Sequence, residues 1–198
     1  MLKNETINVT EVLTHLIYEI IKHTHIFHKI NINKIIVCIA SNRNSGRGGG
    51  IFGKLVPLKF ENGSDVKKFK GRYYSMPEII HDDEKILYLI YFYMPRFFDL
   101  DPIEKLNVIF HELYHISPEF NGDIRRLAKH KAAHGHSKKH FDSHYNDELE
   151  SFFQYIKETS YMNFLALDSN KLYDTFGEIT GRRMKVPKPV LIGKKLRN

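Results

Sequence analysis

The chain has 198 residues, of which 42% are hydrophobic and 13% aromatic, enough apolar surface for one domain of ordinary size. This composition excludes disorder throughout, and the single cysteine, Cys38, excludes an intrachain disulfide and a cysteine-based zinc ribbon. The formal net charge of +7 permits contact with nucleic acid or another polyanion without establishing it.

In chain order, residues 10–28 predict an amphipathic helix, because pairs of apolar residues recur four positions apart. Residues 34–40 form a dense β-branched run that predicts a strand buried on both faces, in which Cys38 is structural. The glycine-rich residues 41–50 predict a hairpin loop, or alternatively a basic rim over an active site. Residues 51–60 alternate loosely, and we expect them to pair with the preceding strand.

Further along, residues 61–78 are polar and predict a loop or short excursion, whereas residues 85–93 give the clearest strand pattern. Residues 147–166 predict a last long helix. Together these elements predict an α+β fold with one domain over residues 1–181, followed by a basic extended tail over residues 182–198. The polar N-terminus and the lack of a long apolar run lead us to expect a cytoplasmic protein without membrane contact.

Residues 108–116 hold an HExxH motif formed by His111, Glu112 and His115. Positions i and i+4 lie one turn apart on the same face of an α-helix, so both imidazoles can face one metal ion. Glu112 lies one residue further round, where its carboxylate can reach a metal-bound water without being a ligand. The spacing therefore predicts a Zn²⁺ centre that lacks only a third ligand. The alternative is a partly buried helix with two incidental histidines.

Local signals place this motif on a helix with a defined start and end. Asp101, Pro102 and Glu104 predict an N-cap, a proline in the first turn and a capping-box glutamate. Apolar residues then recur at helical spacing, and Ser117–Pro118 is expected to end the helix just beyond His115.

A third ligand is expected from the chain that follows a reversal after this helix. The preferred candidates lie in one histidine cluster: His134, His136 and His140. Carboxylates rank below them as alternatives: Glu148, Glu150 and Asp123.

Residues 107–142, with the pattern NVIFHELYHISPEFNGDIRRL…AHGHSKKHFD, resemble the putative phage-type metallopeptidase family and, more distantly, SprT-like zinc peptidases. The resemblance implies a zincin-like fold, in which a small mixed sheet packs on an N-terminal helix, the HExxH helix and a C-terminal helix. It places His134 at the third-ligand position, with His136 as the alternative. It also singles out Asp123 and Arg125 as residues of a shared motif, and Asp123 could orient a ligand histidine. The absence of a cysteine zinc ribbon departs from the SprT pattern.

The leading hypothesis is therefore a zinc metallopeptidase that acts on a polypeptide substrate, with Glu112 as general base. Tyr114 and Arg125 are candidates for stabilising the oxyanion. A second hypothesis is a basic nucleic-acid-associated binding module, which would use the tail and hold a structural or vestigial zinc site. A third is a metal-dependent hydrolase of a non-peptide bond, because HExxH defines the water chemistry and leaves the substrate open.

Overall fold

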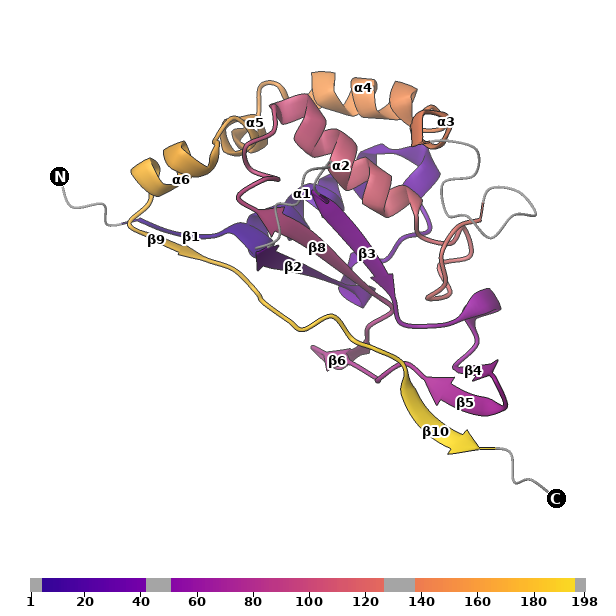
Figure 1. The fold of residues 1–198 in the computed structure, drawn as a ribbon. Helices are drawn as coiled ribbons and strands as arrows, with labels where there is room; N and C mark the ends of the chain where they lie inside the picture. Colours follow the sequence, from indigo (N-terminus) through magenta and orange to yellow (C-terminus); the bar gives the residue numbers. More distant parts are fainter. Residues whose placement is uncertain (1–4, 42–50, 127–137, 195–198) are drawn as a thin grey trace.

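The computed structural model describes residues 5–41, 51–126 and 138–194, and these form an α+β arrangement of small sheets and helices. At its centre lies a mixed three-stranded sheet in the order β2-β8-β3 (Figure 1). Its strands are β2 (Ile35–Ser41), β3 (Gly53–Pro57) and β8 (Tyr88–Met94). Strand β2 pairs with β8 in parallel, and β3 pairs with β8 in the antiparallel direction.

Strand β8 takes the central position, where both of its edges are paired. Its residues 88–92 are fully buried, and a central strand is covered on both edges and both faces. The expectation that residues 51–60 pair with the preceding strand is therefore wrong, since β8 separates β3 from β2. Residues 42–50, which include Arg43 and Arg47, lie outside the described residues.

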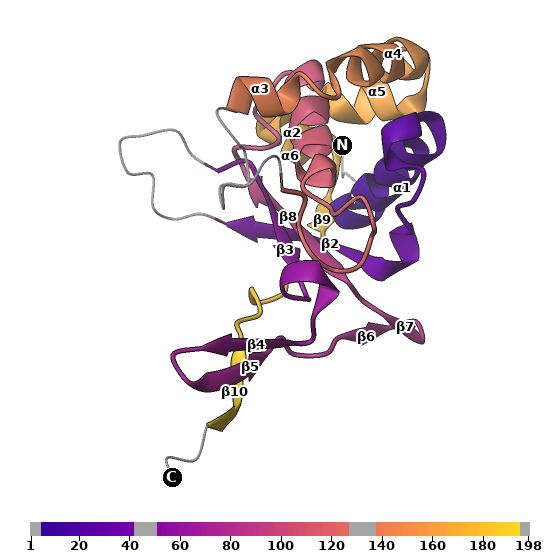
Figure 2. The ribbon, with the colours of Figure 1, turned by 90° about the vertical axis from the view of Figure 1, so that its right-hand side faces the viewer.

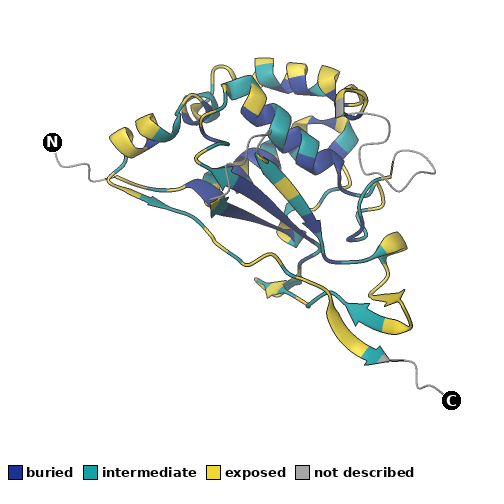
Figure 3. Ribbon diagram, in the orientation of Figure 1, coloured by how far each residue is buried: buried dark blue, intermediate teal, exposed yellow. Residues whose placement is uncertain are grey.

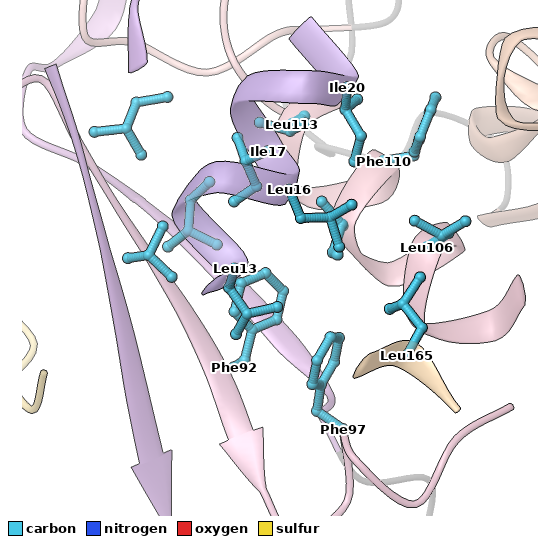
Figure 4. Close-up of a cluster of buried hydrophobic side chains, with 14 of the residues drawn as sticks. Leu13, Leu16, Ile17, Ile20, Phe92, Phe97, Leu106, Phe110, Leu113 and Leu165 are labelled. Carbon is cyan, nitrogen blue, oxygen red and sulfur yellow. The ribbon is translucent and has the colours of Figure 1, made fainter. Parts of the chain in front are cut away.

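Two helices, α1 (Val9–His23) and α2 (Pro102–Tyr114), pack on one face of this sheet. Apolar side chains from both helices and from the sheet point toward one another in the main core (Figure 4). Helix α1 is shorter than predicted because Thr24 adopts an extended conformation, and its hydroxyl donates to the carbonyl of Ile20.

Four shorter helices follow α2 and lie on the same side of the sheet (Figures 1 and 2). They are α3 (Lys138–Asp142), α4 (Asn146–Ile156), α5 (Ser160–Leu165) and α6 (Ser169–Thr175). The single helix predicted over residues 147–166 is thus two helices, because Thr159 has extended backbone angles that interrupt it. The buried Lys105 of α2 donates from Nζ to the carbonyls of Leu165 and Leu167, which satisfies acceptors at the end of α5.

The remaining strands form three smaller sheets. Strands β1 (Thr6–Asn8) and β9 (Glu178–Thr180) pair in parallel, and β6 (Ile80–His81) and β7 (Glu84–Lys85) form an antiparallel ribbon. A three-stranded antiparallel sheet has the order β10-β5-β4, with β4 (Val66–Phe69), β5 (Arg72–Ser75) and β10 (Val190–Lys194). Residues 61–78 therefore contribute two strands as well as the short 3₁₀ helix η3 (Glu61–Gly63).

In the segment predicted as a basic extended tail, residues 182–189 form neither helix nor strand, and residues 190–194 form β10, which pairs with β5. The carbonyl of Arg182 accepts from the amide of Ile39, and the Tyr91 hydroxyl donates to the carbonyl of Lys185. A second apolar cluster under this segment includes Cys38, and burial raises the pKa of its thiol to about 11. Among the described residues, no helix is long and apolar enough to span a bilayer.

Candidate metal centre

Helix α2 begins where its capping residues predict. The Glu104 carboxylate accepts from the backbone N–H of Asp101 at 3.4 Å, which closes the capping box. The buried face of α2 consists of Leu106, Ile109, Phe110 and Leu113, and these side chains pack in the main core. The rotation of the motif residues about the helix axis is therefore determined by core packing rather than by the motif itself.

The two motif histidines converge on one point. The Nε2 atoms of His111 and His115 lie 3.2 Å apart, and the two rings are nearly perpendicular, at 88°. Two nitrogens at the usual zinc–nitrogen distance and a tetrahedral angle are about 3.3 Å apart. The spacing therefore fits two ligands of one tetrahedral ion.

A carboxylate from α3 orients the first of these histidines. Asp142 Oδ1 lies 2.8 Å from His111 Nδ1 and also accepts from the Tyr145 hydroxyl at 2.6 Å. An acceptor at Nδ1 makes this nitrogen the protonated one, which leaves the lone pair of Nε2 directed toward the metal position. Burial, together with the Asp142 hydrogen bond, raises the pKa of Tyr145, so its hydroxyl remains a donor.

The aromatic ring of Phe141, on α3, packs against both motif histidines. The Phe141 ring is fully buried and lies 5.0 Å from the His111 ring and 4.6 Å from the His115 ring, measured between centroids. Helix α3 therefore contributes two functions in consecutive residues: Phe141 packs against both imidazoles, and Asp142 accepts from one of them.

Strand β3 holds the motif glutamate. Glu112 is 6% exposed, and its Oε2 accepts from the backbone N–H of Leu55 at 2.7 Å. The strand approaches so closely that a Cβ at Gly53 would lie 2.9 Å from Glu112 Cγ and equally close to Val108. A glycine at position 53 is thus required for the carboxylate and the strand to meet.

The predicted outer residues Asp123 and Arg125 belong to the loop after α2. Asp123 accepts from the backbone N–H groups of Asn62 and Ile124, both at 2.8 Å, and pairs with Arg126. Burial acts to raise its pKa, but the Arg126 guanidinium and these N–H groups lower it overall.

Arg125 contacts the C-terminal end of α2. Its Nε donates to the carbonyl of Tyr114 at 2.8 Å, its guanidinium carbon lies 4.0 Å from the centre of the Tyr114 ring, and its backbone N–H donates to the carbonyl of His115. Asp123 and Arg125 thus attach the loop to the motif helix, and the carboxylate on His111 comes from Asp142. Sequence reasoning missed Asp142, although this residue ends the segment that carries the family resemblance.

The preferred third-ligand candidates, His134 and His136, lie outside the described residues. The other candidates have contacts of their own: His140 packs beside His144, Glu148 accepts from the amide of Ile26, and Glu150 accepts from Gln154. Within the described part of the chain, no group of three or more His, Cys, Asp or Glu side chains could hold a metal ion.

Two converging imidazole nitrogens beside a buried carboxylate, on one turn of helix, supply the chemistry of two metal ligands and a neighbouring carboxylate, which a metal-dependent hydrolytic centre requires. A comparison with protein families identifies the family to which the chain belongs. The model of a family described as "Putative phage metallopeptidase" matches residues 8–176, and the chain belongs to this family.

Neither the search of curated proteins nor the search of solved structures found a match. The more distant SprT-like resemblance is therefore without support from these comparisons and stays a prediction. The family membership favours a metallopeptidase over a binding module with a vestigial site.

Proposed function

We propose that the protein is a zinc-dependent peptidase of zincin-like design, in which His111 and His115 hold the metal. The observation that carries this proposal is the 3.2 Å approach of their Nε2 atoms, with His111 Nδ1 bound to Asp142. When bound there, zinc would lower the pKa of a water molecule and polarise a carbonyl group. The neutral, nitrogen-rich donor set suits zinc better than calcium or magnesium, which prefer oxygen ligands.

The third ligand is proposed to be His134, with His136 as the alternative. Support comes from the described residues on either side of the segment that contains them. On one side, the backbone N–H of Arg125 donates to the carbonyl of His115 at 2.7 Å. On the other side, Phe141 and Asp142 contact the imidazole rings. The described residues on both sides of this segment thus contact the motif histidines.

Glu112 is proposed as the general base. Its carboxylate would take the proton of the attacking water and pass it to the leaving amine. The Leu55 N–H occupies one carboxylate oxygen, and this contact restricts the rotation of the side chain. A fixed carboxylate loses less entropy in the transition state than a freely rotating one, which favours the proton transfer.

A peptide substrate, rather than a non-peptide one, is supported by the position of β3. Among the described strands, β3 pairs with β8 alone. On its other edge the Leu55 N–H donates to Glu112, so an extended chain added at this edge would compete with Glu112 for this donor. Glu112 meets β3 at this same edge. A peptide added alongside β3 would therefore carry its backbone past the base, in the manner of strand addition.

The decisive experiment compares Glu112→Gln with wild type. The variant should keep its zinc, measured by elemental analysis, and lose cleavage of an unfolded protein substrate by at least about 100-fold. Glu158→Gln, at an exposed position just after α4, is the matched control and should cleave normally.

Wild-type activity in Glu112→Gln would refute the assignment of the base. Unfolding of the chain on zinc removal, together with four protein ligands in the metal-loaded protein, would instead establish a structural site.

A further inference from the structure

Most of the excess positive charge of the chain lies in one sheet. Residues 66–75, which hold β4, β5 and their turn, and residues 190–194, which form β10, carry five Lys and Arg residues and no Asp or Glu. The rest of the chain carries 25 basic and 23 acidic residues, so it contributes only +2 of the net charge of +7. We call β4, β5 and β10 the basic sheet. The sequence separates its two halves by more than 100 residues, and only the pairing of β10 with β5 unites them.

The basic sheet projects from the end of the molecule opposite to the helices (Figure 2), and most of its surface is exposed (Figure 3). Neighbouring lysines outside it are neutralised, since Lys59 pairs with Asp65 and Lys85 with Glu78. In contrast, the four basic residues of β4, β5 and their turn have no ion-pair partner among the described residues: Lys67, Lys68, Lys70 and Arg72.

The register of β4, β5 and β10 places their residues on two opposite faces of the basic sheet. Cross-strand partners share a face, and successive residues of a strand alternate between faces. One face, here the Phe69 face, therefore carries both charge and apolar rings: Lys67, Phe69, Arg72, Tyr74 and Leu191. The opposite face carries Lys68 and Tyr73, with the smaller residues Val66 and Ser75. On the Phe69 face, the Phe69 ring is 53% exposed and Leu191 is 42% exposed, which core packing does not explain.

From this juxtaposition we infer that the Phe69 face binds single-stranded nucleic acid. Lysine and arginine attract phosphates, while the exposed Phe69 ring, with the half-buried Tyr74 on the same face of the sheet, offers a stacking platform for unpaired bases. A duplex keeps its bases inside and would leave Phe69 and Tyr74 without a partner. A second copy of the chain fits poorly, because it would bring two sheets of the same charge together.

The test is fluorescence anisotropy of a labelled oligothymidylate of about 20 nucleotides, titrated with the full chain in the presence of zinc. Each phosphate contact changes single-strand affinity about fourfold at about 0.15 M salt, so Lys67→Gln/Arg72→Gln should bind about 15-fold more weakly. The slope of log affinity against log salt should fall by about 1.4. Phe69→Ala should weaken binding about tenfold through lost stacking, without loss of folding at this exposed position.

The matched control is Lys68→Gln/Lys188→Gln, which removes the same charge from the other face of the hairpin and from the segment before β10. Lys70 is left unchanged because its Nζ lies 5.4 Å from the centre of the Phe69 ring. The control variant should lose no more than about threefold, because only long-range attraction is reduced. Glu112→Gln should bind like wild type, so failure of the peptidase proposal and failure of this one are separable. Equal losses in the two double variants, tighter binding of the matching duplex, or binding to phosphatidylserine vesicles but not to the oligonucleotide would each overturn the inference.

Discussion

Replacing Asp142 tests the proposed metal centre through a residue that is proposed neither as a metal ligand nor as the general base. Its carboxylate makes a 2.8 Å contact with His111 Nδ1, and a hydrogen bond with one charged partner contributes about 1.5–3 kcal/mol. If the zinc-loaded protein loses this hydrogen-bond energy, its affinity for zinc should fall by about 10- to 100-fold. The same range is found when carboxylates that bind metal-ligating histidines are replaced. We therefore expect Asp142→Asn, which keeps a neutral acceptor, to bind zinc about tenfold more weakly. For Asp142→Ala we expect about 100-fold.

Zinc affinity would be measured by competition with a chromophoric chelator, so the result does not depend on catalysis. Asp147→Asn, an exposed residue at the start of α4, changes the charge equally and should bind zinc like wild type. Tyr145→Phe removes the hydroxyl that supports Asp142 and should produce a smaller loss than Asp142→Ala. Wild-type zinc affinity in Asp142→Ala would show that the contact with His111 plays no part in metal binding.

Two further predictions concern residues beside the motif. Gly53→Ala places a methyl group within 2.9 Å of Glu112 and Val108, so it should cost about 1–3 kcal/mol in urea unfolding and reduce cleavage; unchanged values would contradict the close approach of β3. Burial lowers the pKa of Lys105 to about 8, from its ordinary value near 10.4. Between pH of about 8 and about 10.4, the unfolded chain therefore binds more protons than the folded chain. The free energy of unfolding of wild type, relative to Lys105→Met, should therefore rise by up to about 3 kcal/mol as the pH rises through this range; a flat difference in urea titrations would refute the shift.

The features predicted correctly from sequence are those determined by neighbours in the chain. The start of α2 follows from Asp101 and Glu104, three residues apart, and the strand β8 follows from its own run of apolar residues. The motif likewise needs only the 3.6-residue period of a helix to bring His111 and His115 together.

The errors and omissions concern partners that are distant in sequence. The order β2-β8-β3 depends on which strand gains the most free energy when both of its edges are paired. The hydrophobic periodicity of a strand carries no information about its place in the sheet. Asp142 lies 31 residues beyond His111 on a five-residue helix, too short for a clear sequence pattern. Strand β10 falls in the segment predicted as a tail because the residues from Arg182 onward are basic and include Pro187 and Pro189. The partner of β10 is β5, more than 100 residues earlier in the chain.

The contact between Glu112 and strand β3 has a consequence for solvent access. The N–H of Leu55 points away from β8, in the direction where an edge strand ordinarily meets water. Its deuterium uptake is therefore governed by a side chain of α2 and not by a neighbouring strand. That single amide reports, in a protein at rest, whether the Glu112 carboxylate is in its place.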